Sequence, residues 1–233
     1  MTPFFKSGIT QPRLEASFEY PVKHVQLGTG YMTCIDDRNH VYSWGDNYAG
    51  QLGTQDDIHR EEPTLVKSLS DVKVDSLSLG FQHQLFVNEE GQAYGLGKNT
   101  RFQLGKYWNY DTQHGEIFDR YQVANRIEAP EDDSPYFNGE RLKQVSAGKF
   151  HTLFLTESGK VFSTGFNKYG QLGVANSTYV HAEEPIEVFT DGVKIKAISS
   201  GWHHNLLLGE DGKLYGFGAR LNGQIDGQSH KGR

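Results

Sequence analysis

Three histidines recur at one position of a repeated sequence pattern, and imidazole is the side chain that most often binds metals. His83, His151 and His204 are each the third residue after a glycine of the pattern, and Tyr31 holds this place in its first copy. A metal site needs ligands that converge on one ion. The histidines belong to different copies, and none has a second ligand at H-x-x-x-H spacing. We therefore expect no metal, and a structural hydrogen bond from each histidine that pins its own hairpin.

The other motifs predict no enzyme and no cofactor. The repeated glycines lack the Gly-Lys-Ser/Thr of a phosphate-binding loop, and we expect no helix after them to offer its N-terminus. The chain has no G-x-S-x-G, H-E-x-x-H or C-x-x-C motif. No pair of carboxylates is singled out by its position. The sequence therefore predicts a non-catalytic protein.

The composition indicates an intracellular protein. The 233-residue chain has a formal net charge of −6 at pH 7, which argues against binding to nucleic acid. Cys34 is the only cysteine, so no internal disulfide forms, and a lone thiol suits a reducing compartment. Residues 1–21 lack the apolar core of a signal peptide, and no apolar run approaches the ~20 residues of a membrane helix. We expect no membrane insertion and favour the cytoplasm, with nuclear, ciliary and mitochondrial locations left open.

The histidines lie in elements that repeat four times. A segment rich in glycine and aromatic residues aligns without gaps at residues 41–53, 93–105, 161–173 and 214–226. Eight residues hold equivalent positions in these segments: Gly45, Gly97, Gly165 and Gly218, and Gln51, Gln103, Gln171 and Gln224. We assign the glycines to sharp bends. We expect the glutamines to hydrogen-bond the backbone groups that the bends expose, because a buried amide needs partners.

A hairpin precedes each of these segments. Turn pairs separate two apolar runs at Glu90-Gly91, Ser158-Gly159 and Asp211-Gly212. An X-Gly pair between apolar runs favours a tight hairpin turn, because glycine adopts positive φ freely. Arg38-Asn39 is the weaker equivalent, in which Asn39 takes the left-handed conformation. After two of the glutamine segments, residues 61–66 and 183–188 read as short edge strands after a proline.

Units of this length and composition are typical of β-propeller blades with about four strands. Residues 147–173, "AGKFHTLFLTESGKVFSTGFNKYGQLG", contain the order AG-x-x-HT, apolar strand, tight turn and G-x-N-x-x-GQLG. This order resembles the regulator of chromosome condensation (RCC1) repeat family. The resemblance covers roughly residues 12–226, and it implies an all-β, RCC1-like β-propeller.

The repeat spacing divides the chain into a terminal piece and four units. The ranges are 1–21 (the tail of an incomplete repeat or a closing strand), 22–71 (repeat 1), 72–141 (repeat 2, with an inserted loop at 107–141), 142–191 (repeat 3) and 192–233 (repeat 4, incomplete). The resemblance implies a seven-bladed ring, whereas this chain supplies about four blades. The blades could close as a four-bladed ring, or form an arc completed by another chain or by missing sequence. We favour the arc, and expect protein partners in a stable assembly to cover its open ends, because exposed apolar faces and strand edges invite association.

The inserted loop is the segment that we predict to bind a partner. It carries Trp108, Tyr110, Phe118 and Tyr121, and clustered aromatic residues suit interface anchors. The alternative is a surface loop that packs its aromatic side chains on its own blade. We interpret the chain as a non-catalytic scaffold subunit of a larger assembly. The alternative is a guanine-nucleotide exchange factor or regulator of a small GTPase, which the family resemblance implies and which the short ring and the acidic balance oppose. A fragment of a longer RCC1-like protein is compatible with either.

Overall fold

The computed structural model describes residues 16–105, 120–128, 135–174, 180–220 and 222–225. They form antiparallel sheets that follow one another along the chain. The first sheet contains β1 (Val22–Leu27), β2 (Tyr31–Asp36), β3 (Val41–Gly45) and β4 (Arg60–Leu65). The second contains β5 (Val74–Leu79), β6 (His83–Asn88), β7 (Ala93–Lys98) and β8 (Arg120–Arg126). The third contains β9 (Leu142–Ala147), β10 (His151–Thr156), β11 (Val161–Phe166) and β12 (His181–Glu187). The fourth contains β13 (Ile195–Ser200), β14 (His204–Gly209) and β15 (Leu214–Gly218).

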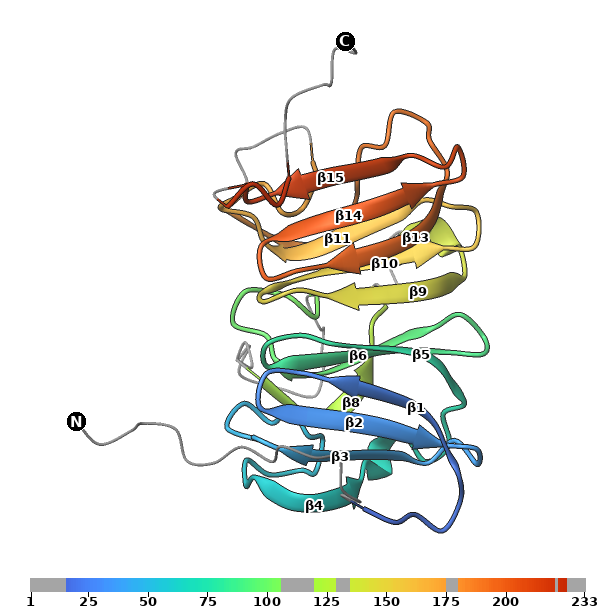
Figure 1. Ribbon diagram of the computed structural model, residues 1–233, viewed down its shortest axis with the longest axis vertical. Helices are drawn as coiled ribbons and strands as arrows, with labels where there is room; N and C mark the ends of the chain where they lie inside the picture. The colour runs from blue at the N-terminus through green and yellow to red at the C-terminus, as the bar shows by residue number, and fades with distance from the viewer. Residues whose placement is uncertain (1–15, 106–119, 129–134, 175–179, 221, 226–233) are drawn as a thin grey trace, which may run out of the picture.

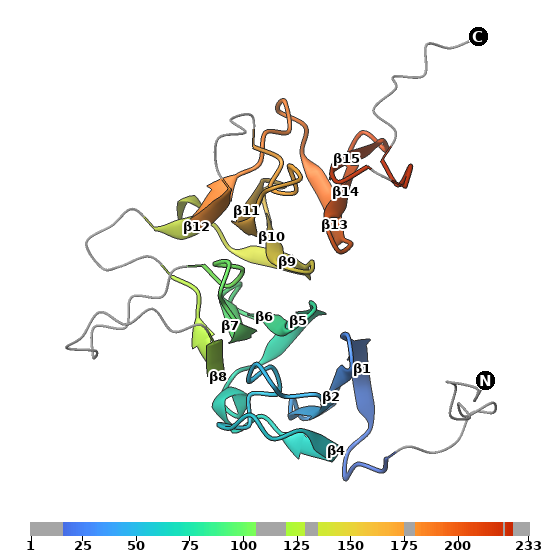
Figure 2. The same cartoon turned by 90° about the vertical axis from the view of Figure 1, so that its left-hand side faces the viewer.

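The four sheets stand side by side as blades of a partial β-propeller (Figures 1 and 2). The first strands of successive sheets, β1, β5, β9 and β13, contact one another in that order along the inner side. The last strands, β4, β8 and β12, lie on the outer side (Figure 2). In the described part of the chain the first and fourth sheets lie at opposite ends of the arc, and no ring closes. The favoured arc is therefore the observed architecture.

The hairpin turns have the positive φ angles that the sequence predicted. Asn39 has φ 65°, and Gly91, Gly159 and Gly212 have φ between 75° and 90°. Positive φ at these positions lets the second and third strands of each sheet pair directly. The two proline-marked segments form the outer strands β4 and β12, where an absent N–H breaks no ladder with a further strand.

Apolar side chains hold neighbouring sheets together. One buried cluster joins the first two sheets and includes Ile35 and Phe86. A second joins the middle sheets and includes Leu85 and Phe154, and a third, with Leu153 and Leu207, joins the last two. Each fully buried Leu, Ile or Phe contributes about 1.5–3 kcal/mol relative to an exposed one, so these clusters stabilise each junction between neighbouring sheets.

The predicted insertion, residues 107–141, is not all surface loop. Its residues 120–126 are β8, which completes the second sheet beside β7. Near its end, the short 3-10 helix η2 (Tyr136–Gly139) buries Phe137 against Phe154 and Phe162, with ring centroids 4.9 Å and 5.6 Å away. β8 lacks the Glu-Glu-Pro marker of β4 and β12, which is why the repeat pattern did not reveal it.

Candidate functional site

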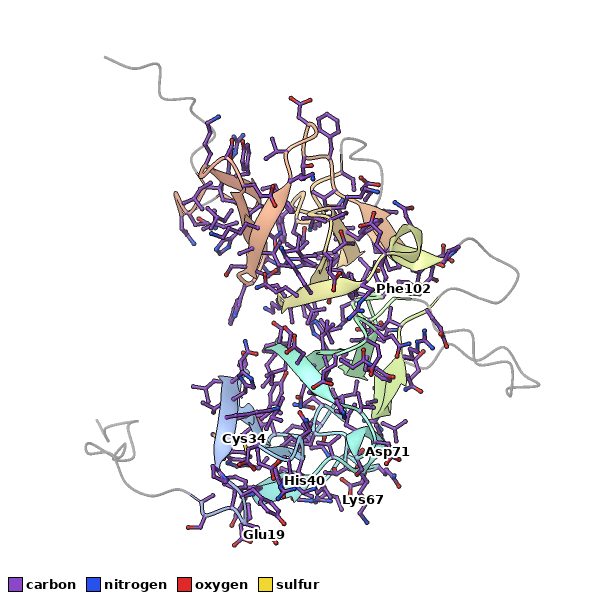
Figure 3. All side chains as sticks on the ribbon, turned by 90° about the vertical axis from the view of Figure 1, so that its right-hand side faces the viewer. Glu19, Cys34, His40, Lys67, Asp71 and Phe102 are labelled. Atoms are coloured by element: carbon purple, nitrogen blue, oxygen red, sulfur yellow. The ribbon has the colours of Figure 1, made fainter. Side chains whose placement is uncertain are left out.

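The loops that follow the first and third strands of the sheets gather on one side of the arc, which we call the loop end. The second and third strands pair in antiparallel fashion, so that the start of β10 at His151 lies opposite the end of β11 at Gly165. The same register places Tyr31 opposite Gly45 in the first sheet. Figure 2 looks onto this loop end, and Figure 3 looks onto the opposite, hairpin-turn end, where His40 is labelled.

The glutamines of the repeat stabilise the bends at this end. In each bend the Oε1 atom accepts a hydrogen bond from the backbone N–H two residues earlier: Ala49 to Gln51 (2.9 Å), Arg101 to Gln103 (3.0 Å), Tyr169 to Gln171 (2.9 Å) and Asn222 to Gln224 (2.8 Å). The expectation of a bond from each glutamine to exposed backbone is therefore confirmed four times. These side chains hold the bends in shape and offer no reactive group.

Two sets of glycines are needed where backbone and rings come close. A Cβ on Gly45, Gly97, Gly165 or Gly218 would collide with the carbonyl oxygen of a residue at the start of the preceding strand. A Cβ on Gly28, Gly80, Gly148 or Gly201 would collide with the aromatic ring three residues later, from Tyr31, His83, His151 or His204. Each ring of the repeated position therefore lies directly over its own glycine.

His83 and His151 join neighbouring sheets, so the expectation that each pins its own hairpin is wrong for these two. The His151 ring in the third sheet hydrogen-bonds Asn205 Oδ1 in the fourth, at 2.8 Å from Nε2. His83 Nε2 lies 3.3 Å from Thr152 Oγ1 in the third sheet. Burial lowers the pKa of His83 to about 3 and that of His151 to about 4. Among the described residues no three His, Cys, Asp or Glu side chains gather as metal ligands would.

The residue after each ring position completes the link between sheets. Its side chain donates to the main-chain carbonyl of the repeat glutamine in the preceding sheet: Gln84 to Gln51 (2.5 Å), Thr152 to Gln103 (2.6 Å) and Asn205 to Gln171 (2.8 Å). At the first junction, the Tyr31 hydroxyl donates to the carbonyls of Gly80 and His83. We call these contacts, with those of His83 and His151, the inter-sheet hydrogen bonds. They are buried, so they fix the sheets relative to one another.

Partly buried or exposed positions next to these buried ones carry aromatic rings and a lysine. Phe81, Lys149 and Trp202 each follow the motif glycine of their sheet, and Phe150 follows Lys149. The Phe81 ring contacts the rings of Phe150 and Trp202, with centroids 5.9 Å and 6.3 Å apart. The Lys149 ammonium lies among them, 4.4 Å from the Trp202 ring centroid. Three sheets thus contribute to one cluster.

The cluster extends onto the bends of the second and third sheets. The Phe150 ring contacts Phe166, which contacts Tyr169. Arg101 lies over the Phe166 ring at 5.5 Å, and Lys168 lies near that of Tyr169 at 6.0 Å. We call this set the aromatic–cationic surface: Phe81, Arg101, Lys149, Phe150, Phe166, Lys168, Tyr169 and Trp202. A recess of about 210 Å³ adjoins it at the inner side, lined by all four sheets.

Models of a known repeat match much of the chain. Two models described as the regulator of chromosome condensation (RCC1) repeat match residues 38–87 and 158–208, and residues 142–171 and 195–224. These matches contain the glycine, ring and glutamine positions of the third and fourth sheets. The chain belongs to the RCC1 repeat family.

Relatives and solved structures agree with this assignment. The chain is 28% identical to the ultraviolet-B receptor UVR8 of Arabidopsis thaliana, over 94% of this chain and 46% of the relative. It is 31% identical to the guanine nucleotide exchange factor SRM1 of Saccharomyces cerevisiae, over 84% of this chain and 39% of the relative. The structure of yeast RCC1 (Prp20) bound to Kap60 superposes with a TM-score of 0.69 and 19% identity, over 88% of this chain and 45% of that one. The chain thus spans less than half the length of these RCC1-repeat proteins.

Of the partner-binding residues predicted from sequence, Tyr121 alone lies within the described part of the chain, outside the aromatic–cationic surface. Trp108, Tyr110 and Phe118 are outside the described residues. Tyr121 lies in β8 and packs, half-buried, against the core between the middle sheets, where burial raises the pKa of its hydroxyl. Its role as a partner anchor stays a prediction. Sequence reasoning missed Phe81 and Trp202, whose only signal is that an RCC1-repeat position beside a constant glycine changes in every copy.

Proposed function

We propose that this RCC1-repeat chain is a non-catalytic protein-interaction module, a scaffold subunit of a larger assembly, whose partners dock on the aromatic–cationic surface. The observation that carries the proposal is the exposure of large rings on a rigid support. Trp202 is 57% exposed and Tyr169 is 41% exposed, while the sheets beneath are joined by buried hydrogen bonds. Tryptophan, tyrosine and arginine are enriched among the residues that dominate binding energy at protein interfaces.

The two ends of the arc supply a second contact region. The first sheet exposes Val25 and Leu27, each at 68%, and the fourth exposes Leu214 at 69%. Exposed apolar side chains on sheet faces favour association with other protein surfaces. The proposed assembly therefore covers these faces, which fits a subunit that works inside a complex. An intracellular location, expected from the lone cysteine, is part of the same proposal.

A capture experiment tests the proposed function. Tagged wild-type chain and a Phe81→Ala, Trp202→Ala double variant are used to capture proteins from the source cells, and the retained proteins are compared by quantitative mass spectrometry. The specific partners are expected to be lost from the double variant. Tyr48→Ala is the matched control, because Tyr48 is 68% exposed at the same end but belongs to the first sheet. Unchanged retention by the double variant would contradict the proposal.

The same capture separates two candidate docking regions. A Trp108→Ala, Tyr110→Ala, Tyr121→Ala triple variant removes aromatic residues of the 107–141 segment. If this variant loses the partners while the Phe81→Ala, Trp202→Ala variant keeps them, the segment is the docking site and the aromatic–cationic surface is not.

The second candidate function is nucleotide exchange on a small GTPase. The observation that favours it is the 31% identity to the exchange factor SRM1. Release of labelled GDP from a panel of small GTPases, with and without the chain, tests this candidate. Acceleration by a stoichiometric amount of the chain would support exchange, and an unchanged release rate across the panel would reject it.

A further inference from the structure

We propose that the aromatic–cationic surface recognises an acidic segment of a protein chain, with carboxylates at its cations and an apolar side chain against Trp202. This inference rests on the proposed function and names the chemistry of the partner. It follows from a comparison of cations at the loop end with cations at the hairpin-turn end: the latter lie in ion pairs, and the former do not.

At the hairpin-turn end, three cations of the third and fourth sheets are matched by anions. Arg141 pairs with Glu157 at 3.3 Å, and Lys160 pairs with Glu140 at 2.7 Å. Lys213 pairs with Asp211 at 3.2 Å. Because their charges are neutralised in these pairs, these three cations of the hairpin-turn end (the end facing the viewer in Figure 3) offer little net attraction to an anionic partner.

At the loop end, the three cations of the aromatic–cationic surface have no such partners. Arg101, Lys149 and Lys168 take part in none of the ion pairs between described residues. They lie over aromatic rings instead. A ring attracts a cation through its quadrupole but leaves its net charge intact. This part of the surface therefore attracts anions.

Lys149 is held in place for such a contact. Its ammonium lies 4.4 Å, 5.2 Å and 5.5 Å from the ring centroids of Trp202, Phe81 and Phe150. Its backbone N–H donates to the Trp202 carbonyl of the neighbouring sheet. Its charge acts on the neighbourhood, since it adds to burial in lowering the pKa of His203. A side chain already ordered by rings loses less entropy when a partner binds.

The neighbouring sheet favours a short acidic segment over a nucleic-acid strand. At the same end, the first sheet carries Asp46, Asp56 and Asp57, of which Asp56 and Asp57 pair with Arg60 and Arg120. A phosphate backbone that tracked across the arc would meet these carboxylates after only a few cations, whereas nucleic-acid sites need an extended basic path. The exposed Trp202 face suits an apolar side chain from the same acidic segment.

Fluorescence anisotropy with defined probes tests the inference. The probe is a short fluorescein-labelled peptide that alternates glutamate and phenylalanine, compared with its glutamine–phenylalanine counterpart and with labelled oligothymidylate. The acidic peptide is expected to bind best and to weaken as salt rises, because salt screens exposed charge pairs. Lys149→Met, which keeps an apolar stem among the rings, is expected to weaken binding about tenfold, as for the loss of one desolvated charge contact.

Lys213→Met is the matched control, because it removes a lysine at the opposite end, and it should leave peptide binding unchanged. A thermal unfolding transition like that of the wild type is required of both variants, to show that they fold. Equal binding of the neutral peptide, an unaffected Lys149→Met variant, or tighter binding of oligothymidylate would each overturn the inference. The proposed function fails separately: if captured partners are lost from the Phe81→Ala, Trp202→Ala variant while the acidic peptide does not bind, the module stands and only the acidic chemistry is wrong.

Discussion

The inter-sheet hydrogen bonds and the aromatic–cationic surface occupy adjacent positions of the same repeat, and they differ in how they vary. The third position after the motif glycine is an aromatic ring in every copy, Tyr31 or a histidine, and it is buried in the first three copies. The first position is Thr29, Phe81, Lys149 or Trp202, of which Thr29 and Trp202 are exposed and the other two are partly buried. At each of the three junctions a buried ring of one sheet reaches a polar group of the next sheet, because packing and hydrogen bonding leave few alternatives. An exposed position carries no such constraint, so its side chains can serve a partner.

The inter-sheet hydrogen bonds also show how far the residue type can vary at a buried position. Gln84, Thr152 and Asn205 differ in length and chemistry, yet each donates to the carbonyl of the preceding repeat glutamine. What is kept is a hydrogen-bond donor, and not one residue type. The following substitutions therefore separate architecture from recognition by their effect on stability.

The largest loss of stability is expected from Asn205→Leu. Asn205 is fully buried, donates to the Gln171 carbonyl and contacts the His151 ring. Leucine leaves both groups buried without a partner, and each unsatisfied group costs about 1–3 kcal/mol. The free energy of unfolding in urea should fall by roughly 2–5 kcal/mol. Asn125→Leu is the control, because the Asn125 amide bonds the Val123 carbonyl of its own strand, and it should cost less. Equal losses would show that the inter-sheet hydrogen bonds have no special weight.

A somewhat smaller loss is expected from Gly148→Ala. The new Cβ would collide with the His151 ring, so the ring or the loop must shift and the bond to Asn205 is strained. Overpacking of this kind typically costs about 1–3 kcal/mol. In Gly216→Ala, the nearest atoms lie 3.3 Å from the added Cβ, and urea unfolding should show a smaller change. If the two alanines cost the same, the ring position does not require its glycine.

Stability should decline as the pH falls from about 6.5 toward 4. His83 and His151 have pKa values of about 3 and about 4 in the folded chain because burial penalises the imidazolium. The unfolded chain protonates the same rings near pH 6.5, so it binds more protons and gains from acid. Each ring contributes a slope of up to about 1.4 kcal/mol per pH unit in this window. Urea unfolding between pH 7 and 5 measures the slope. His151→Gln should flatten it, and an unchanged slope would place the proton uptake elsewhere.

Sequence alone predicted the features that depend on local chemistry. The left-handed Asn39, the glycine turns and the glutamine-to-backbone bonds each involve atoms a few residues apart, so the repeat pattern was sufficient. It failed where contacts join distant segments. His151 was assigned to its own hairpin, yet it reaches Asn205 in the next sheet. Phe137 carried no repeat signal, yet it fills the core between the middle sheets.

The candidate site was beyond the sequence for the same reason. Phe81, Lys149 and Trp202 belong to separate units and share no motif. They meet only because the sheets stand side by side, which brings the first position after each motif glycine together at the loop end, on the inner side of the arc. A constant residue could be found by aligning the copies, whereas this convergence requires the arc.

The smallest effect on stability is expected from Trp202→Ser. The ring is 57% exposed, and its contacts are the Phe81 ring and the Lys149 ammonium. A cation–π contact at an exposed site contributes about 0.5–1 kcal/mol, so the free energy of unfolding should change by about that amount. Binding of the acidic peptide should nevertheless fall strongly, because exposed tryptophans act as interface anchors. Urea unfolding and anisotropy on the same preparation compare the two effects. If Trp202→Ser destabilised the fold as much as Asn205→Leu, the ring would belong to the architecture, and the division between buried and exposed repeat positions would fail.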